Sequence, residues 1–309
     1  MLPVLAVIAA AVLFGTTGTA QALGPAGTTP LGVGALRLVI GGTALAVLGL
    51  ALAARRRRLR GSGAPPRSRR AIVLMATTGV CLAAYQPLFF LGTARNGVAV
   101  GTVIALGSAP VLAGVLEAVL TRRIPRPTWM VATALATVGV ALLALGGGGG
   151  AASAATDPIG VLGSIGAGAA FAVLANAQRR LMDDGWDPFT VAGAMGLGSA
   201  VTATLMLPFS DLSWLAEPTG VAMAVWLGLA TIAIAYTLFT WGLERLSAAT
   251  AATLTLTEPL TASLLGIAVL GERLAAAGTA GIIVLAAGLI VLAWGSRRPR
   301  DPQPFAVEG

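Results

Sequence analysis

Apolar stretches of about 20 residues recur along the whole length of this 309-residue chain. Coiled as an α-helix, such a stretch is long enough to cross the roughly 30 Å hydrocarbon core of a bilayer. Only 10% of the residues are charged, against about a quarter in an ordinary soluble domain, and the mean hydropathy is +0.87. Because a backbone in lipid must satisfy its own hydrogen bonds, the pattern predicts an all-α, polytopic membrane bundle.

We expect ten transmembrane helices, separated by turns that are rich in proline and glycine. They are predicted at residues 3–22, 31–53, 71–92, 97–121, 128–147, 159–178, 189–209, 219–242, 247–271 and 275–295. The glycine-rich segment 148–158 is predicted to be a flexible connector between two five-helix halves, 1–147 and 159–295. The polar, proline-rich residues 296–309 are predicted to form a disordered tail.

The distribution of arginine predicts how the chain is oriented. All 20 basic residues are arginine, and eight of them fall in the loop 55–70. If the N-terminus is cytosolic, 17 arginines lie on the cytosolic side, Arg95 and Arg273 lie on the other, and Arg37 lies inside a helix. Since arginine-rich loops stay in the cytosol, both termini are predicted to be cytosolic, in the cytoplasmic (inner) membrane. The role of arginine in membrane orientation explains the sequence pI of 11.4 better than nucleic-acid binding does. Contact with anionic membrane lipids is a second role of these arginines.

An internal repeat relates the two halves. Pro110 and Pro259 lie 149 residues apart, each near the middle of a predicted helix and each followed 29 residues later by a glycine. Earlier in each half, Phe14 and Gln21 recur as Phe171 and Gln178. Because five is odd, the second half must begin on the opposite side of the membrane, so the repeat is predicted to be inverted, as in many secondary transporters. Both prolines are expected to be helix hinges that free the carbonyls of Leu106 and Thr255, with a plain packing kink as the alternative.

Charged side chains within the spans mark a candidate solute site near the midplane. Glu258 lies at the centre of its helix beside Pro259, where a charge is costly to keep, and Thr257 precedes it on a threonine-rich helix. Glu258 is also the candidate coupling carboxylate if protons drive transport, with facilitated diffusion as the alternative. Arg37 lies at nearly the same depth, so an ion pair that a solute interrupts is within reach. Snorkelling of Arg37 to the outer interface is the other interpretation.

Aromatic and amide groups complete the candidate solute site. Deep phenols and amides need polar partners, whereas tryptophan and tyrosine near span ends are usually interfacial anchors. The remaining predicted solute-binding residues are Tyr85, Gln86, Tyr236 and Trp241. Glu117 lies near Arg122 and Arg123, and we expect it to snorkel or to pair with them.

No cofactor or metal site is expected, and the chain is predicted not to be an enzyme. It has no histidine and one cysteine, and the glycine run 146–150 lacks the lysine of a phosphate-binding loop. An alternative is a membrane-embedded enzyme that acts on lipid or isoprenoid headgroups, because Asp183, Asp184 and Asp187 form an acidic cluster. A solvated loop is the favoured interpretation of that cluster, because a DDxxD metal motif is mimicked but not matched. A non-transporting scaffold is a third alternative, and the sequence leaves the oligomeric state open.

Residues 97–120 and 247–274 resemble the EamA repeat of the drug/metabolite transporter superfamily. The resemblance is carried by a helix start rich in small residues, the pair Glu258-Pro259, and Gly271, Glu272 and Arg273 before a glycine-rich last helix. The segment 14–21 and Arg37 also look like the first repeat, although that half has Ala109-Pro110 and Arg122-Arg123 at the matching positions. The resemblance implies ten helices, cytosolic termini, and export or exchange of small metabolites such as amino acids, amines or drug-like solutes by alternating access.

Overall fold

The computed structural model describes residues 1–60, 68–146 and 157–295, and this part of the chain is helical without strands. Its α-helices are α1 (Leu2–Ala22), α2 (Pro30–Arg60), α3 (Arg69–Thr121), α4 (Pro127–Gly146), α5 (Pro158–Asp183), α6 (Pro188–Thr204), α7 (Pro218–Gly228), α8 (Ala235–Leu243), α9 (Ala248–Leu254), α10 (Thr257–Leu270) and α11 (Ala276–Gly295). Two 3₁₀ turns, η1 (Leu207–Phe209) and η2 (Ser213–Ala216), and a π-helical turn, η3 (Leu229–Ile234), connect them. The predicted all-α membrane bundle is confirmed. The predicted tail 296–309 and residues 148–156 of the predicted connector lie outside the described residues.

Prolines and aspartates set where α5 and α6 begin. Pro158 and Pro188 occupy the first turn of these helices, where no backbone donor is required. Asp157 and Asp187 precede them, and each carboxylate accepts the backbone N–H two residues further on, at 2.8 and 3.0 Å. The predicted starts at 159 and 189 agree with these caps to within one residue.

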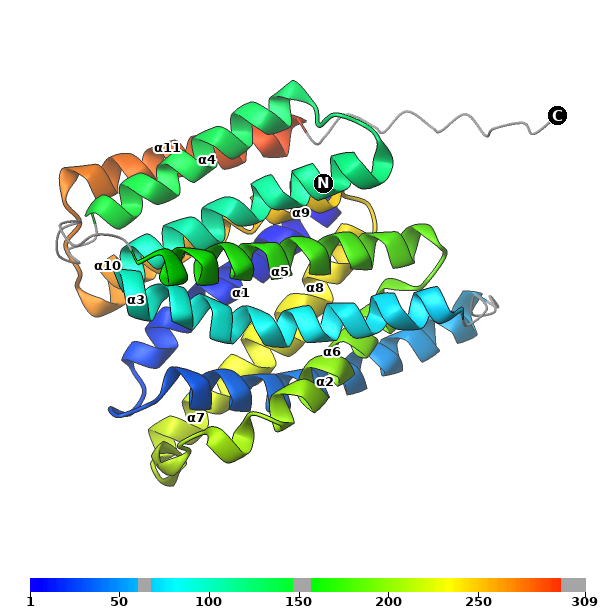
Figure 1. The fold of residues 1–309 in the computed structure, drawn as a ribbon, viewed down its shortest axis with the longest axis horizontal. Coiled ribbons are helices and arrows are strands. Elements are labelled where there is room, and N and C mark those ends of the chain that lie inside the picture. The colour runs from blue at the N-terminus through cyan, green and yellow to red at the C-terminus, as the bar shows by residue number, and fades with distance from the viewer. Residues whose placement is uncertain (61–67, 147–156, 296–309) are drawn as a thin grey trace.

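Helix α3 contains two membrane crossings that meet at Gly97. This residue has a φ of +80°, a conformation that costs little only without a side chain, and the chain turns back on itself there (Figure 1). The crossings run over Arg69–Val98 and Val100–Thr121. The predicted end of the first crossing at residue 92 is too early, because a single glycine makes the turn without a loop.

Nine helical stretches within the described residues are long and apolar enough to cross a membrane. Helix α6, with 17 residues, packs against α2 as the tenth crossing. The outer surface of the bundle carries large apolar side chains such as Val47, Leu145 and Trp294, which are 67%, 72% and 66% exposed. Because so apolar a surface is unusual in water, it suits contact with lipid chains.

The two halves pack in exchanged pairs within one bundle (Figure 1). The first helix of each half packs on the fourth crossing of the other half: α1 on α10, and α5 on the second part of α3. Corresponding helices also pair directly, α2 with α6 and α4 with α11. This exchange is the arrangement expected for two repeats related by a two-fold axis in the membrane plane.

Glycine allows the closest of these helix contacts between α4 and α11. A Cβ atom at Gly139 would lie 2.5 Å from the backbone nitrogen of Leu285, and one at Gly146 would overlap the backbone of Gly278. Small residues at helix crossings let two backbones approach in lipid, where apolar burial alone gives little driving force. The α4–α11 pair is therefore joined by backbone packing.

Arginine side chains gather at one end of the bundle. The start of α1 and the end of α11 both lie at that end (Figure 1). The described arginines there are Arg55, Arg56, Arg57, Arg58, Arg69, Arg70, Arg122, Arg123, Arg126, Arg179, Arg180 and Arg245. Arg95, two residues before the turn at Gly97, and Arg273, between α10 and α11, lie at the other end. We call the two ends the arginine-rich end and the opposite end.

Candidate functional site

The crossing that carries Glu258 is interrupted near the middle of the bundle. Helix α9 ends at Leu254 and α10 begins at Thr257, with a two-residue turn between them. Pro259 has no N–H for the carbonyl of Thr255, and the backbone N–H of Glu258 donates to that carbonyl instead, at 2.8 Å. The predicted free carbonyl at Thr255 is therefore satisfied within the turn.

The corresponding crossing of the first half is continuous. Pro110 lies inside α3, and the helix runs through it to Thr121. The two copies thus differ in backbone as well as in the residue before the proline, which is Ala109 in one and Glu258 in the other.

A cavity of about 140 Å³ lies between the two halves beside the interruption. It can hold several water molecules or a small solute, since a single water needs only ~10–15 Å³ of such space. Both halves contribute to its wall, which consists of Phe14, Thr17, Gln21, Arg37, Leu82, Tyr85, Gln86, Phe89, Phe90, Thr102, Leu106, Ala109, Phe171, Ile232, Tyr236, Thr255, Leu256 and Glu258.

Five of the predicted solute-binding residues meet at this cavity: Arg37, Tyr85, Gln86, Tyr236 and Glu258. Thr257 and Trp241 are not among the lining residues. Thr257 is buried where α10 begins, and Trp241 is only partly buried near the end of α8. Thr257 and Trp241 are therefore not part of the candidate site.

Arg37 is held inside the bundle by the facing half. Its Nη2 donates to the Thr231 hydroxyl at 3.2 Å. Thr231 belongs to the π-helical turn η3, and single π turns inside helices often occur at functional sites. The Nε of Arg37 is buried and has no hydrogen-bond partner among the described residues. The side chain thus faces the cavity with a donor to spare.

The predicted ion pair between Arg37 and Glu258 is not formed in this structure. Among the described residues, no carboxylate oxygen lies within 4.0 Å of the Arg37 guanidinium. Both side chains nevertheless line the same cavity. The cavity therefore presents a positive and a negative group that do not neutralise each other by direct contact.

Other polar groups on the cavity wall are also without a protein partner. The side chains of Tyr85, Gln86, Tyr236 and Glu258 form no hydrogen bond or ion pair with any described residue. Buried polar groups in folded proteins nearly always have a partner, whether protein, water or ligand. This wall is therefore suited to contact water or a polar solute.

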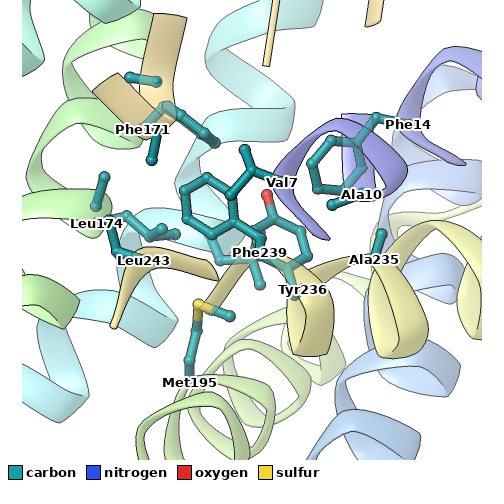
Figure 2. Close-up of a cluster of buried hydrophobic side chains, with 14 of the residues drawn as sticks. Val7, Ala10, Phe14, Phe171, Leu174, Met195, Ala235, Tyr236, Phe239 and Leu243 are labelled. Carbon is teal, nitrogen blue, oxygen red and sulfur yellow. The ribbon is translucent and has the colours of Figure 1, made fainter. Parts of the chain in front are cut away.

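Aromatic rings form the apolar part of the wall. The rings of Phe14 and Tyr236 have centroids 5.0 Å apart, Tyr85 stacks on Phe89 at 5.9 Å, and Phe171 meets Tyr85 edge-on at 6.5 Å. Figure 2 shows Phe14 and Phe171 on either side of the buried cluster that contains Tyr236. Phe14 and Phe171, equivalent positions of the repeat, thus both reach the cavity.

The cavity occupies the part of the bundle between the midplane and the opposite end. Gln21 near the end of α1 and Thr102 near the start of the second crossing of α3 both lie toward the opposite end. Toward the arginine-rich end the space is filled by buried apolar side chains (Figure 2), among them Val7, Leu174, Met195, Phe239 and Leu243. The structure therefore describes a state that is closed at the arginine-rich end.

The acidic cluster after α5 serves the fold. Asp187 caps α6, as described above. Each aspartate also has an arginine partner: Asp183 pairs with Arg179, Asp184 with Arg70 and Asp187 with Arg56. These contacts account for the cluster without a bound metal.

Comparison with known proteins agrees with this architecture. The model of the EamA-like transporter family matches residues 1–145 and again residues 158–294. A protein of Bacillus subtilis (strain 168), described as the uncharacterized transporter YwfM, is 40% identical over 297 residues, which cover 96% of this chain and 95% of that protein. A solved crystal structure, which matches 96% of this chain and 99% of its own with a TM-score of 0.75, is only 20% identical, so that likeness shows the fold alone. The chain is thus a multi-pass membrane protein that belongs to the EamA-like transporter family.

Proposed function

We propose that this protein is a secondary transporter that moves a small polar metabolite across the cytoplasmic membrane by alternating access, as an exporter or exchanger. The observation that carries the proposal is the set of polar side chains, of both charges, that face one cavity between the two halves with hydrogen-bonding atoms left without a protein partner. An amino acid, an amine or a drug-like solute has the size and polarity for such a cavity.

Each group on the wall suits one part of such a solute. The free Nε of Arg37 is a donor for an anionic group, and the Glu258 carboxylate is an acceptor for a cationic one. The phenols of Tyr85 and Tyr236 and the amide of Gln86 supply neutral hydrogen bonds. The aromatic rings pack against the apolar part of the solute.

The interruption of the ninth crossing supplies a hinge beside Glu258. Helices α9 and α10 are joined by a two-residue turn, so α10 can tilt without breaking a continuous helix. We propose that this tilt, together with rocking of one half against the other, moves the cavity from one side to the other. Pro259 maintains the turn, whereas Pro110 lies in a continuous helix and acts as a weaker hinge.

We propose that the arginine-rich end faces the cytosol, so that both termini and the predicted tail are cytosolic. The support is the excess of arginine at that end over Arg95 and Arg273 at the other. The described state is then open toward the outside and closed toward the cytosol.

Coupling to protons would act through Glu258. A carboxylate that is wet in one state and dry in the other takes up and releases a proton as the states exchange. The Glu258→Gln protein is then expected to fold normally and to lose its dependence on a pH gradient. The same gradient-driven flux in vesicles with and without this substitution would reject proton coupling.

The alternative of a membrane-embedded enzyme has less support. The family match is to transporters, and Asp183, Asp184 and Asp187 are engaged with arginines. Formation of a product by the purified protein in the presence of a divalent metal would reverse this preference.

The proposal is tested by comparing metabolites inside and outside cells that overproduce the wild-type protein, the Glu258→Gln protein or the Glu217→Gln protein. Glu217 is an exposed carboxylate before α7 and serves as the matched control. We expect one class of polar metabolite to shift across the membrane with the wild type and the control but not with Glu258→Gln. Identical profiles in all cells, including cells without the protein, would reject transport.

A further inference from the structure

A buried amide lies in the closed half of the bundle, away from the cavity. Gln178 on α5 is 0% exposed. Its amide nitrogen donates to the Met195 sulfur at 2.8 Å, and its amide oxygen accepts from the Thr240 hydroxyl at 3.1 Å. A thioether is a weak acceptor, so this amide is poorly satisfied for a group that has left water. An apolar side chain would fill the same place at a lower free-energy cost. The presence of a glutamine here therefore points to a role in another conformation of the protein.

Gln178 occupies the same place in the second half as Gln21 in the first. Each glutamine follows its phenylalanine, Phe171 or Phe14, by seven residues. The two phenylalanines lie near the middle of the bundle and both line the cavity. From there Gln21 lies toward the opposite end, on the cavity wall, whereas Gln178 lies toward the arginine-rich end. The repeat thus places one glutamine in the open half and its equivalent in the closed half.

The helices around the two glutamines differ in the same way. In the open half the cavity separates α1 from the first crossing of α3, and Gln21 and Tyr85 face it from these two helices. The corresponding helices of the second half, α5 and α8, are joined by the hydrogen bond between Gln178 and Thr240. The cavity that separates α1 from the first crossing of α3 is thus replaced by a direct contact between α5 and α8 in the second half.

Two arginines hold that contact closed. Arg56 reaches from α2 to Asp187 at the start of α6 and to Glu244 at the end of α8, at 3.1 and 3.2 Å. Arg179, the residue after Gln178, donates to two carbonyls that end α8, those of residues 243 and 244. These side chains tie α2, α5, α6 and α8 together at the arginine-rich end. We call Arg56, Arg179, Asp187 and Glu244 the seal.

We propose that Gln178, Thr240 and Met195 are the latent half of the transport pathway. When the opposite end closes and the seal opens, these side chains line a water-filled cavity at the arginine-rich end, and Gln178 faces that cavity as Gln21 faces the described one. The seal keeps this half closed until that exchange. The inference rests on the proposed alternating access, and it adds the residues that form the second cavity.

Cysteine labelling tests this inference directly, because Cys81 is the single cysteine of the chain. In a Cys81→Ala background we would introduce Gln178→Cys, Thr240→Cys or Gln21→Cys, and treat membrane vesicles of both orientations with a small, membrane-impermeant thiol reagent. Ala136→Cys, fully buried on α4 outside the pathway, is the matched control. Thr240→Cys is a second reporter in case Gln178→Cys fails to fold.

We expect Gln21→Cys to be labelled from the opposite end, and Gln178→Cys and Thr240→Cys to react slowly from the arginine-rich end. Adding Arg56→Gln weakens the seal. Labelling of Gln178→Cys and Thr240→Cys should then rise by about tenfold, as for a ~1.4 kcal/mol shift in the balance of states. Labelling of Gln21→Cys should fall in the same protein, while Ala136→Cys stays protected.

Other results would overturn the inference. If Arg56→Gln slows labelling of Gln21→Cys while Gln178→Cys and Thr240→Cys stay protected, the states exchange but the second cavity lies elsewhere. If all rates are unchanged by Arg56→Gln, the seal assignment is wrong. If Ala136→Cys is labelled as fast as Gln178→Cys, the protein has merely loosened. Failure of the proposed function is seen separately, as the absence of any metabolite shift with the wild-type protein.

Discussion

Gly15 of α1 meets α10 beside the candidate site, and replacing it tests how closely the two halves fit there. A Cβ atom at Gly15 would lie 2.6 Å from the Cβ of Thr261 and 2.7 Å from the carbonyl oxygen of Glu258. Carbon atoms in contact normally lie about 3.5–4.0 Å apart, so Gly15→Ala must push α1 and α10 apart by about 1 Å. At Gly18, one turn further along α1, an added Cβ meets nothing within 4 Å.

The two substitutions therefore differ by the cost of the clash alone. Overpacking of this kind costs ~1–3 kcal/mol, and alanine in place of glycine within a helix returns roughly 0.5–1 kcal/mol. We expect Gly15→Ala to lower the free energy of unfolding by about 1–2 kcal/mol and Gly18→Ala to leave it unchanged or raise it slightly. Since Gly15 lies against the carbonyl of Glu258, Gly15→Ala should also slow transport.

Thermal unfolding of the two variants in the same detergent measures this difference. A change of 1 kcal/mol moves Tm by roughly 2–4 °C in a domain of this order of size. Gly15→Ala should therefore melt several degrees below the wild type, and Gly18→Ala at or above it. Equal shifts in the two variants would mean that α1 does not pack against α10 at Gly15, which would refute the geometry described for the site.

Two further predictions concern stability. Thr253→Val should lower the free energy of unfolding by ~2–4 kcal/mol, because it leaves the Trp129 N–H and the Thr133 hydroxyl, now 3.0 and 2.9 Å from the Thr253 hydroxyl oxygen, without a partner. Denaturant titration of the micelle-bound protein measures this loss. A loss no larger than that caused by Thr133→Val would contradict the prediction. Asp157→Asn keeps the helix cap but removes the ion pair with Arg95, whose hydrogen bond holds the pKa of Asp157 below its ordinary value. That stabilisation is present at neutral pH and is lost as the pH falls through the lowered pKa, so the variant should show a weaker loss of Tm between neutral and acidic pH. The same acid dependence in both proteins would rule the ion pair out as its source.

The membrane-spanning architecture could be predicted because the length of each apolar stretch and the residues that start and end helices are local signals in the sequence. α5 and α6 each begin with a proline that follows an aspartate, and these starts were predicted to within one residue. The turn between the third and fourth crossings was predicted at residues 93–96, but these residues are helical and the chain turns at Gly97, because a glycine with positive φ reverses it without a loop. A hinge was expected at both prolines, but the sequence did not show that the helix breaks at residues 255–256 in the second half and stays continuous in the first. The π turn at 229–234 was missed because it lies inside a continuous apolar segment.

The sequence identified the site residues whose charge is costly in lipid. It did less well with uncharged residues, because the rotation of each helix decides which of them face the cavity. Arg37 and Glu258 stand out because charge within a span needs a reason, and both line the cavity. Trp241 lies five residues after Tyr236, about 140° around the helix, and so does not share its wall. Glu117 was expected to snorkel or to pair with arginines but accepts the backbone N–H at position 249 at 2.8 Å, capping α9. The start of α9 was itself predicted to within one residue, at 247, but no local signal shows that Glu117, on a distant crossing, lies against it.

The central claim is that the cavity between the halves, with Glu258 on its wall, is the route of the solute. Its most direct test is efflux from liposomes that contain purified protein and are loaded with the metabolite identified by profiling. We expect Glu258→Gln to reduce the efflux rate about tenfold or more, since a hydrogen bond to a charged group contributes ~1.5–3 kcal/mol, while Glu217→Gln leaves the rate unchanged. Efflux through the Glu258→Gln protein at the wild-type rate, with equal amounts of folded protein, would contradict the account.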